Sequence, residues 1–118
     1  MTVLLDGTVL AALVIAEHEH HDRVGRWLAT QPDFALCPVS EAALLRFLLR
    51  LGESQATALA VLAAIRQHPK CRFWPADLEF GALSADELTT ADDLSQAYLA
   101  ALARANGGEL ATLDTLAA

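Results

Sequence analysis

The stretch that decides the fold is residues 3–10, VLLDGTVL. Three apolar residues in a row, followed by an acid and a glycine, predict a short buried strand that ends at Asp6. The apolar run at residues 9–16 predicts a helix, for which Thr8 is a suitable N-terminal cap. The chain therefore opens with a buried strand that carries a carboxylate at its C-terminal end.

The same pattern of short strands and longer helical segments continues along the chain. Ser40 and Ser54 are expected to cap helices, and Gly52 to end one. Strands are predicted at residues 34–37, 71–74 and 109–113, and helices at 17–29, 41–51, 54–67 and 91–105, whereas residues 77–88 give no clear pattern. This alternation is typical of a parallel sheet flanked by helices, so we expect a single α/β domain of about four strands over residues 1–118.

The composition limits the classes of protein that fit. Of 118 residues, 54% are hydrophobic and 19% charged, which excludes a disordered chain. The 24 alanines and 22 leucines favour helix over sheet. A net charge of −7 with one lysine argues against a protein that follows a nucleic-acid backbone with basic side chains. An enzyme that meets nucleic acid through bound divalent cations remains compatible with this charge.

Cysteine content and apolar runs indicate the compartment. Cys37 and Cys71 do not make a disulfide framework, which favours a reducing environment. The first six residues carry no basic segment typical of a signal peptide. The longest apolar runs have eight residues, whereas a membrane span needs about 20. We therefore expect a cytoplasmic protein with no membrane association.

Three acids follow the predicted strands. Asp6 ends the first strand, Asp114 ends the last, and Glu41 follows the second by a short loop. Because the carboxyl ends of parallel strands meet at one edge of the sheet, we expect these carboxylates to lie together. A hard divalent cation such as Mg²⁺ or Mn²⁺ would offset their repulsion. The simpler alternative is that each acid only caps a helix or forms a turn.

Several segments, taken in order, resemble the PIN domain family and within it the VapC-type toxins. Residues 3–10 are similar to the opening motif, and residues 38–41 (PVSE) with 44–46 (LLR) are similar to the second. Residues 73–77 (FWPAD) resemble a subgroup of VapC-type toxins, and residues 97–103, 107–108 and 110–114 resemble the closing motifs. The resemblance covers essentially the whole chain.

This resemblance implies a metal-dependent endoribonuclease toxin of a VapBC-type toxin–antitoxin pair. Asp6, Glu41 and Asp114 would be its catalytic carboxylates and its ligands for Mg²⁺ or Mn²⁺, and a metal-activated water would hydrolyse the RNA phosphodiester. The implied partners are an RNA such as tRNA or rRNA, a VapB-type antitoxin and a second copy of the chain. The antitoxin, rather than this chain, would bind DNA.

The chain departs from the family pattern at two places. The family usually has an aspartate directly before the pair Ala97-Tyr98, where this chain has Gln96. Asp92 and Asp93 precede Gln96 by about one turn and would either supply the missing charge or serve as ordinary helix N-terminal acids. Relatives also continue from the last acid to a further edge strand, which we expect to be missing here. Both departures favour an alternative, a degenerate PIN domain that binds its antitoxin without catalysis.

Two further polar residues are candidates for supporting roles. Thr8 would either hydrogen-bond to Asp6 or substrate, or only cap the helix. Arg46 lies about 140° around the helix from Glu41. It would contact a phosphate or an antitoxin carboxylate, or form an internal salt bridge.

The other conspicuous side chains are expected to be structural. His18, His20 and His21 lack the spacing of a helical zinc pair and are predicted to lie on a solvated helix surface. Trp27 is expected in the core or in a dimer interface. A receiver-like signalling domain, which also places acids at strand ends, would need a lysine late in the sheet. The single lysine, Lys70, precedes the third strand instead.

Overall fold

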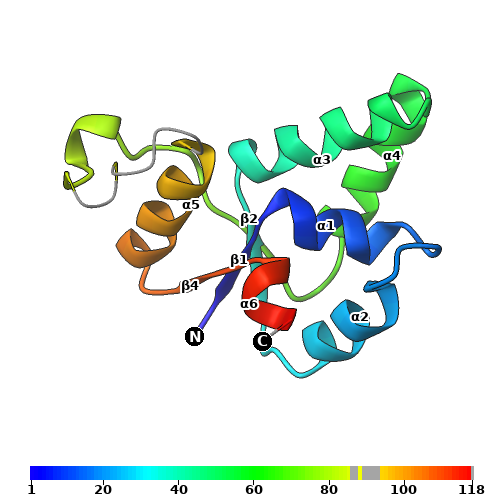
Figure 1. The fold of residues 1–118 in the computed structure, drawn as a ribbon, viewed down its shortest axis with the longest axis horizontal. Helices are drawn as coiled ribbons and strands as arrows, with labels where there is room; N and C mark the ends of the chain where they lie inside the picture. The colour runs from blue at the N-terminus through cyan, green and yellow to red at the C-terminus, as the bar shows by residue number, and fades with distance from the viewer. Residues whose placement is uncertain (86–87, 89–93, 118) are drawn as a thin grey trace.

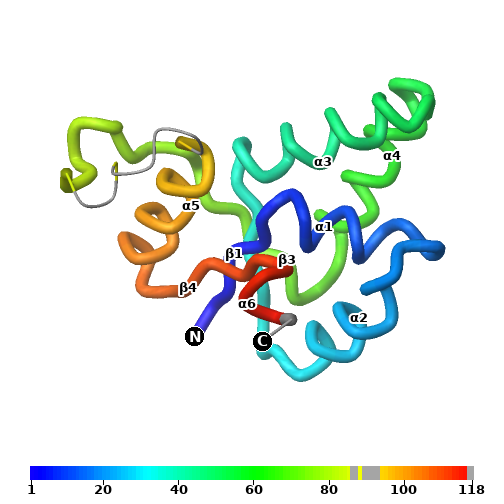
Figure 2. Tube along the Cα trace, in the orientation of Figure 1, coloured from blue at the N-terminus to red at the C-terminus, as the bar shows by residue number. Residues whose placement is uncertain are grey.

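A four-stranded parallel sheet forms the centre of the protein. The computed structural model describes residues 1–85, 88 and 94–117. The strands are arranged in the order β3-β2-β1-β4, and each pair of neighbours is parallel, as predicted. Figure 1 labels β2, β1 and β4, and Figure 2 labels β3. Their bounds are β1 (Val3–Leu5), β2 (Phe34–Leu36), β3 (Cys71–Phe73) and β4 (Glu109–Ala111).

Helices cover both faces of this sheet. The helical segments are α1 (Gly7–Val14), α2 (His21–Ala29), α3 (Pro38–Arg50), α4 (Gln55–Arg66), the 3-10 turn η1 (Phe80–Ala82), α5 (Leu94–Ala105) and α6 (Leu113–Ala117). Figure 2 shows the chain returning from α5 through β4 to α6. The described elements thus confirm the single α/β domain, although the predicted helix at 91–105 is described only from Leu94.

Alternation along the strands divides the core into two clusters. Val3 and Leu5 pack with residues of α1, α2, α3 and α4 on one face. Leu4 and Ala35 pack with Tyr98 and other residues of α5 on the opposite face. Trp27 is partly buried against the first cluster, in agreement with the predicted core position. The central strands β1 and β2 are therefore buried on both faces, and the strand ends are left as the place for a site.

Two of the predicted helix caps are wrong. Asp6 rather than Thr8 caps α1, because its side chain accepts a hydrogen bond from the backbone N–H of Val9. Helix α3 begins at Pro38, with Cys37 at the N-cap position, and the Ser40 hydroxyl inside the first turn accepts from the backbone N–H of Cys37. The predicted cap at Ser54 is confirmed.

Helix α1 approaches α3 closely at a glycine. A Cβ atom on Gly7 would lie 2.6 Å from the Cβ atom of Ala43. Because real Cβ contacts are longer than this, only glycine allows the present spacing of the two helices. Because Gly7 directly follows Asp6, the close contact between α1 and α3 also fixes the position of the Asp6 carboxylate relative to α3.

Cys37 and Cys71 are both free, Cys37 buried and Cys71 half-buried. Burial raises the pKa of the Cys71 thiol. Among the described residues, no helix is long and apolar enough to cross a membrane.

Candidate functional site

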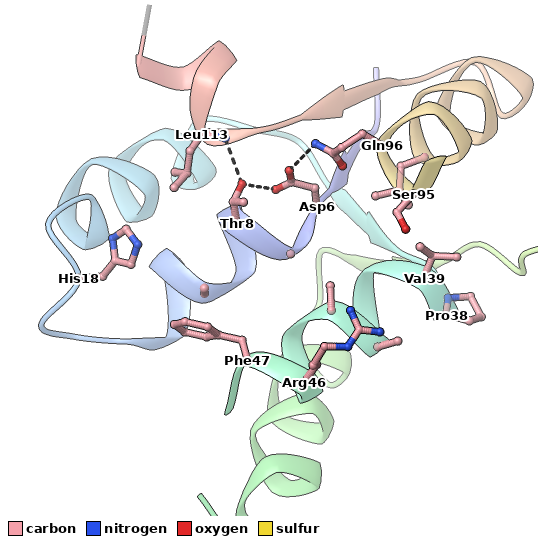
Figure 3. A pocket seen from close by; sticks show the side chains of 15 residues that line it. Asp6, Thr8, His18, Pro38, Val39, Arg46, Phe47, Ser95, Gln96 and Leu113 are labelled. Atoms are coloured by element: carbon pink, nitrogen blue, oxygen red, sulfur yellow. Dashed lines mark hydrogen bonds between the residues drawn. The ribbon is translucent and has the colours of Figure 1, made fainter. Parts of the chain in front are cut away.

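A cavity of about 740 Å³ lies beyond the carboxyl end of β1, between α1, α3 and α5 (Figure 3). Such a volume is within the usual range for ligand pockets. The start of α1 contributes Asp6, Gly7, Thr8 and Ala11. The remaining lining residues are Pro38, Val39, Ala42, Ala43, Arg46 and Phe47 from α3, Ser95, Gln96 and Leu99 from α5, and His18 and Leu113. The cavity therefore forms at the sheet edge where the sequence predicts a site.

Asp6 is the buried polar centre of this cavity. Its residue is 1% exposed, and Oδ1 accepts hydrogen bonds from the Val9 backbone N–H at 2.9 Å and from Thr8 Oγ1 at 2.7 Å. Its Oδ2 accepts from Gln96 Nε2 at 3.0 Å. Burying a charged group is costly unless it is hydrogen-bonded, and the N-terminus of α1 also favours a negative charge here. The local structure thus holds one carboxylate in a fixed position.

Thr8 links this carboxylate to the end of the chain. Its hydroxyl donates to Asp6 and accepts a hydrogen bond from the backbone N–H of Leu113 at 3.3 Å. Leu113 is the first residue of α6. A single hydroxyl therefore connects β1, α1 and α6, which supports the predicted role of Thr8 as a partner of Asp6.

Glu41 lies on a different side of α3. Its Oε2 accepts a hydrogen bond from Nη1 of Arg66 at 2.9 Å, and the Arg66 guanidinium lies 4.4 Å from the centre of the Phe73 ring. Glu41 does not line the cavity. The cavity-facing positions Ala42 and Ala43 are about 100° and 200° further around the helix. Glu41 in this structure ties α3 to α4.

Asp114 also lies outside the cavity lining. Strand β4 ends at Ala111, so Asp114 is not at the strand end as predicted but in the first turn of α6, where it is exposed. Asp92 and Asp93 are outside the described residues. Within the described part of the chain, no three His, Cys, Asp or Glu side chains are close enough to hold a metal ion. The expected cluster of three carboxylates is therefore not formed in this arrangement, and the roles of Glu41 and Asp114 stay predictions.

Arg46 does line the cavity, on the opposite side of α3 from Glu41. This agrees with the rotation of about 140° expected between the two positions. Arg46 is exposed, and it forms no ion pair or side-chain hydrogen bond with the residues that the structure describes. Among the residues that the structure describes, Arg46 therefore forms no internal salt bridge.

His18 and Phe47 are among the lining residues that the sequence did not identify as site residues. The three neighbouring histidines are partly buried rather than fully solvated. His18 Nδ1 accepts a hydrogen bond from the backbone N–H of His20 at 3.1 Å, and His21 Nδ1 lies 2.9 Å from the carbonyl oxygen of Ala12. The helical spacing of Phe47 with Val39 and Ala43 was the available signal for a residue on the same face of α3.

Comparison with known proteins identifies the family. The PIN domain model matches residues 3–117. The chain therefore belongs to the PIN domain family. Ribonuclease VapC29 of Mycobacterium tuberculosis is 46% identical over 116 residues, which cover 98% of this chain and 87% of the relative. Ribonuclease VapC39 of the same organism is 33% identical over 124 residues, covering 97% and 89%. Within the PIN family the chain is thus of the VapC type.

A solved structure supports the same fold. VapC20 of Mycobacterium tuberculosis, described as a toxin that cleaves the sarcin–ricin loop, matches with a TM-score of 0.64 at 23% identity. The match covers 90% of this chain and 84% of that one. At this level of identity, the comparison establishes the fold.

Proposed function

We propose that this protein is a metal-dependent endoribonuclease, the toxin of a VapBC-type pair. The observation that carries the proposal is the buried Asp6 carboxylate in an open cavity, in a chain 46% identical to a ribonuclease of the VapC type. The substrate is RNA, and a VapB-type antitoxin is the partner. A homodimer is the expected assembly.

The side chains around Asp6 fit a hard divalent cation. Carboxylate, hydroxyl and amide oxygens are the ligand types that Mg²⁺ and Mn²⁺ prefer, and Mg²⁺ commonly takes one or two carboxylates together with waters and substrate phosphates. We assign Asp6 as the first ligand. Asp114 directly follows Leu113, whose N–H donates to Thr8, so we assign it as the second. When bound, the cation would lower the pKa of a water and offset negative charge on the phosphate.

The chain's own residues prepare this site for phosphate chemistry. Thr8 and the N-terminus of α1 fix the direction of the Asp6 carboxylate. Arg46 supplies a positive charge on the facing wall, suited to a phosphate oxygen. Hydrolysis would add the water oxygen to phosphorus and break one ester bond, and the leaving oxygen would take up a proton. Glu41 would take part only after leaving Arg66.

A specific observation favours a second candidate, a PIN domain that binds its antitoxin but is catalytically weak. Gln96 donates a neutral hydrogen bond to Asp6 at the position where the family usually has an aspartate. With fewer anionic ligands, the affinity for a divalent cation falls. Such a protein would keep the fold and the cavity and lose turnover.

The deciding experiment is cleavage of total tRNA by the protein purified without its partner. Reactions contain Mn²⁺, Mg²⁺ or EDTA, and Asp6→Asn serves as the control for contaminating nuclease. We expect discrete cleavage with metal that EDTA and Asp6→Asn both abolish. Equal cleavage by wild type and Asp6→Asn contradicts the proposal. If both are silent and Gln96→Asp gains activity, the second candidate is correct.

A further inference from the structure

Three side chains that would not ligate a metal also line the cavity. His18, from the connection between α1 and α2, and Phe47, from α3, lie on the side of Asp6 away from Gln96, whereas Arg46, the residue before Phe47, turns its guanidinium toward Val39 (Figure 3). We call these three residues the aromatic end of the cavity. Asp6 and Thr8 lie between this end and Gln96, so any ligand there would be continuous with the candidate site.

Phe47 is not explained by the core. Among the described residues, it belongs to neither buried cluster and is not one of the partly buried side chains packed against them, whereas its neighbour Leu45 is. The alanines one turn before it, Ala42 and Ala43, leave room in front of this face of α3. A large apolar ring that faces a cavity instead of the core is suited to contact a ligand.

His18 and Arg46 both offer donors to the cavity. Because His18 Nδ1 accepts from the backbone N–H of His20, the neutral ring carries its proton on Nε2. No partner for that N–H occurs among the described residues. Arg46 likewise has no partner in the described part of the chain. The aromatic end therefore combines a flat apolar surface, one neutral donor and one cationic group.

We propose that the aromatic end binds a single unpaired nucleotide of the RNA next to the bond that is cut. Its base stacks on Phe47, His18 Nε2–H donates to an acceptor on that base, and Arg46 binds the adjacent phosphate. This inference rests on the proposed function. Sequence-specific RNA recognition uses splayed, single-stranded bases that stack on aromatic rings, and the available groups are donors that match phosphate and base acceptors.

The test measures RNA binding rather than cleavage. Fluorescein-labelled single-stranded RNA of about ten nucleotides is titrated with wild-type protein in Ca²⁺, a hard divalent cation that can bridge carboxylates and phosphates, and followed by fluorescence anisotropy. A gel confirms that the RNA stays intact during the titration. Phe47→Leu should weaken binding about tenfold, and Phe47→Trp should restore it to within about threefold. Phe80→Leu is the matched control, because Phe80 is an exposed ring outside the cavity, and it should leave affinity unchanged.

A second set of oligonucleotides tests the base directly. A single abasic nucleotide is moved along the RNA, and at one position it should weaken wild-type binding about tenfold while leaving Phe47→Leu unaffected. Melting curves confirm that each variant is folded. The proposal is overturned if wild type binds none of these RNAs, if Phe47→Leu binds as wild type does, or if the abasic penalty is equal in both proteins. If Phe47→Leu weakens binding of the antitoxin but not of RNA, the aromatic end belongs to the antitoxin interface and the proposal is also overturned.

The outcomes separate this inference from the proposed function. If RNA binding depends on the base and on Phe47 but no cleavage occurs, the result supports the nucleotide-binding site and contradicts the proposed endoribonuclease activity. If RNA cleavage requires Asp6 but RNA binding does not depend on Phe47, the result supports the endoribonuclease activity and contradicts the nucleotide-binding site.

Discussion

The Nε2 atom of Gln96 lies 3.0 Å from Oδ2 of Asp6, so an amide from α5 donates to the end of β1. Within the described residues, Asp6 is the only carboxylate that lines the cavity. A neutral donor stabilises a buried carboxylate without adding charge, whereas an aspartate at position 96 would place a second negative charge beside it. Gln96 therefore favours the metal-free protein at the expense of metal affinity.

Gln96→Asp should reverse this balance. We expect the affinity for Mn²⁺ to rise about tenfold, because an additional anionic ligand strengthens binding of a hard cation. The free energy of unfolding in EDTA should fall by about 1 kcal/mol, since a donor to a buried carboxylate is lost. Electron paramagnetic resonance of free Mn²⁺ and urea unfolding measure the two effects. Gln96→Ala is the control and should show the loss of stability without the gain in affinity.

Thr8→Val removes the hydroxyl that joins Asp6 to Leu113 and keeps the shape of the side chain. We expect the free energy of unfolding to fall by about 1 kcal/mol and the rate of RNA cleavage to decrease, because the carboxylate loses its shortest hydrogen bond. Thr8→Ser should retain most of both quantities. If Thr8→Val cleaves RNA like wild type, the hydroxyl has no part in holding Asp6.

Gly7→Ala should separate α1 from α3. The new Cβ atom would meet Ala43 at 2.6 Å, and overpacking of this kind costs about 1–3 kcal/mol in the free energy of unfolding. Gly25→Ala, in α2, is the matched control, because nothing lies within 4 Å of its added Cβ atom. That substitution should stabilise the protein by about 0.5–1 kcal/mol. Equal effects of the two changes in thermal unfolding would contradict the close approach of α1 and α3.

The position of Glu41 predicts that it matters less for metal binding than Asp6. Because Glu41 is paired with Arg66 outside the cavity, Glu41→Gln should change the Mn²⁺ affinity by less than about threefold. The free energy of unfolding of Glu41→Gln should fall by about 0.5–1 kcal/mol, because a partly exposed ion pair is lost. Arg66→Met should give a similar loss of stability. A loss of Mn²⁺ affinity as large as that of Asp6→Asn would show that Glu41 leaves Arg66 to act as a ligand.

The sequence predicted the fold well because the strands are short apolar runs that end at clear stop signals. Residues 3–5 end at an acid, and residues 34–36 end just before Pro38. In a parallel sheet these ends must meet at one edge, so the location of the cavity followed from the order of the elements. The position of Asp6 in that cavity could therefore be predicted without knowing how the side chains pack.

The side chains that join Asp6 were harder to predict, because they depend on rotation about helix axes. The sequence predicted that α3 begins at Glu41, whereas it begins at Pro38. The prediction therefore omitted the first turn of the helix, in which Pro38 and Val39 line the cavity. Asp114 illustrates the same limit, since β4 ends at Ala111, three residues earlier than this acid. The ion pair between Glu41 and Arg66 joins residues that are 25 positions apart, and no pattern in one sequence predicts such a pairing.

Titration of the protein with Mn²⁺ tests the central claim most directly, because it asks whether the Asp6 carboxylate holds the metal. Wild type and Asp6→Asn are compared by electron paramagnetic resonance at the same protein concentration, with Asp22→Asn, an exposed acid in α2, as the control. We predict that Asp6→Asn weakens Mn²⁺ binding at least about tenfold and that Asp22→Asn leaves it unchanged. Equal Mn²⁺ affinity of wild type and Asp6→Asn would contradict the assignment of this cavity as the metal site.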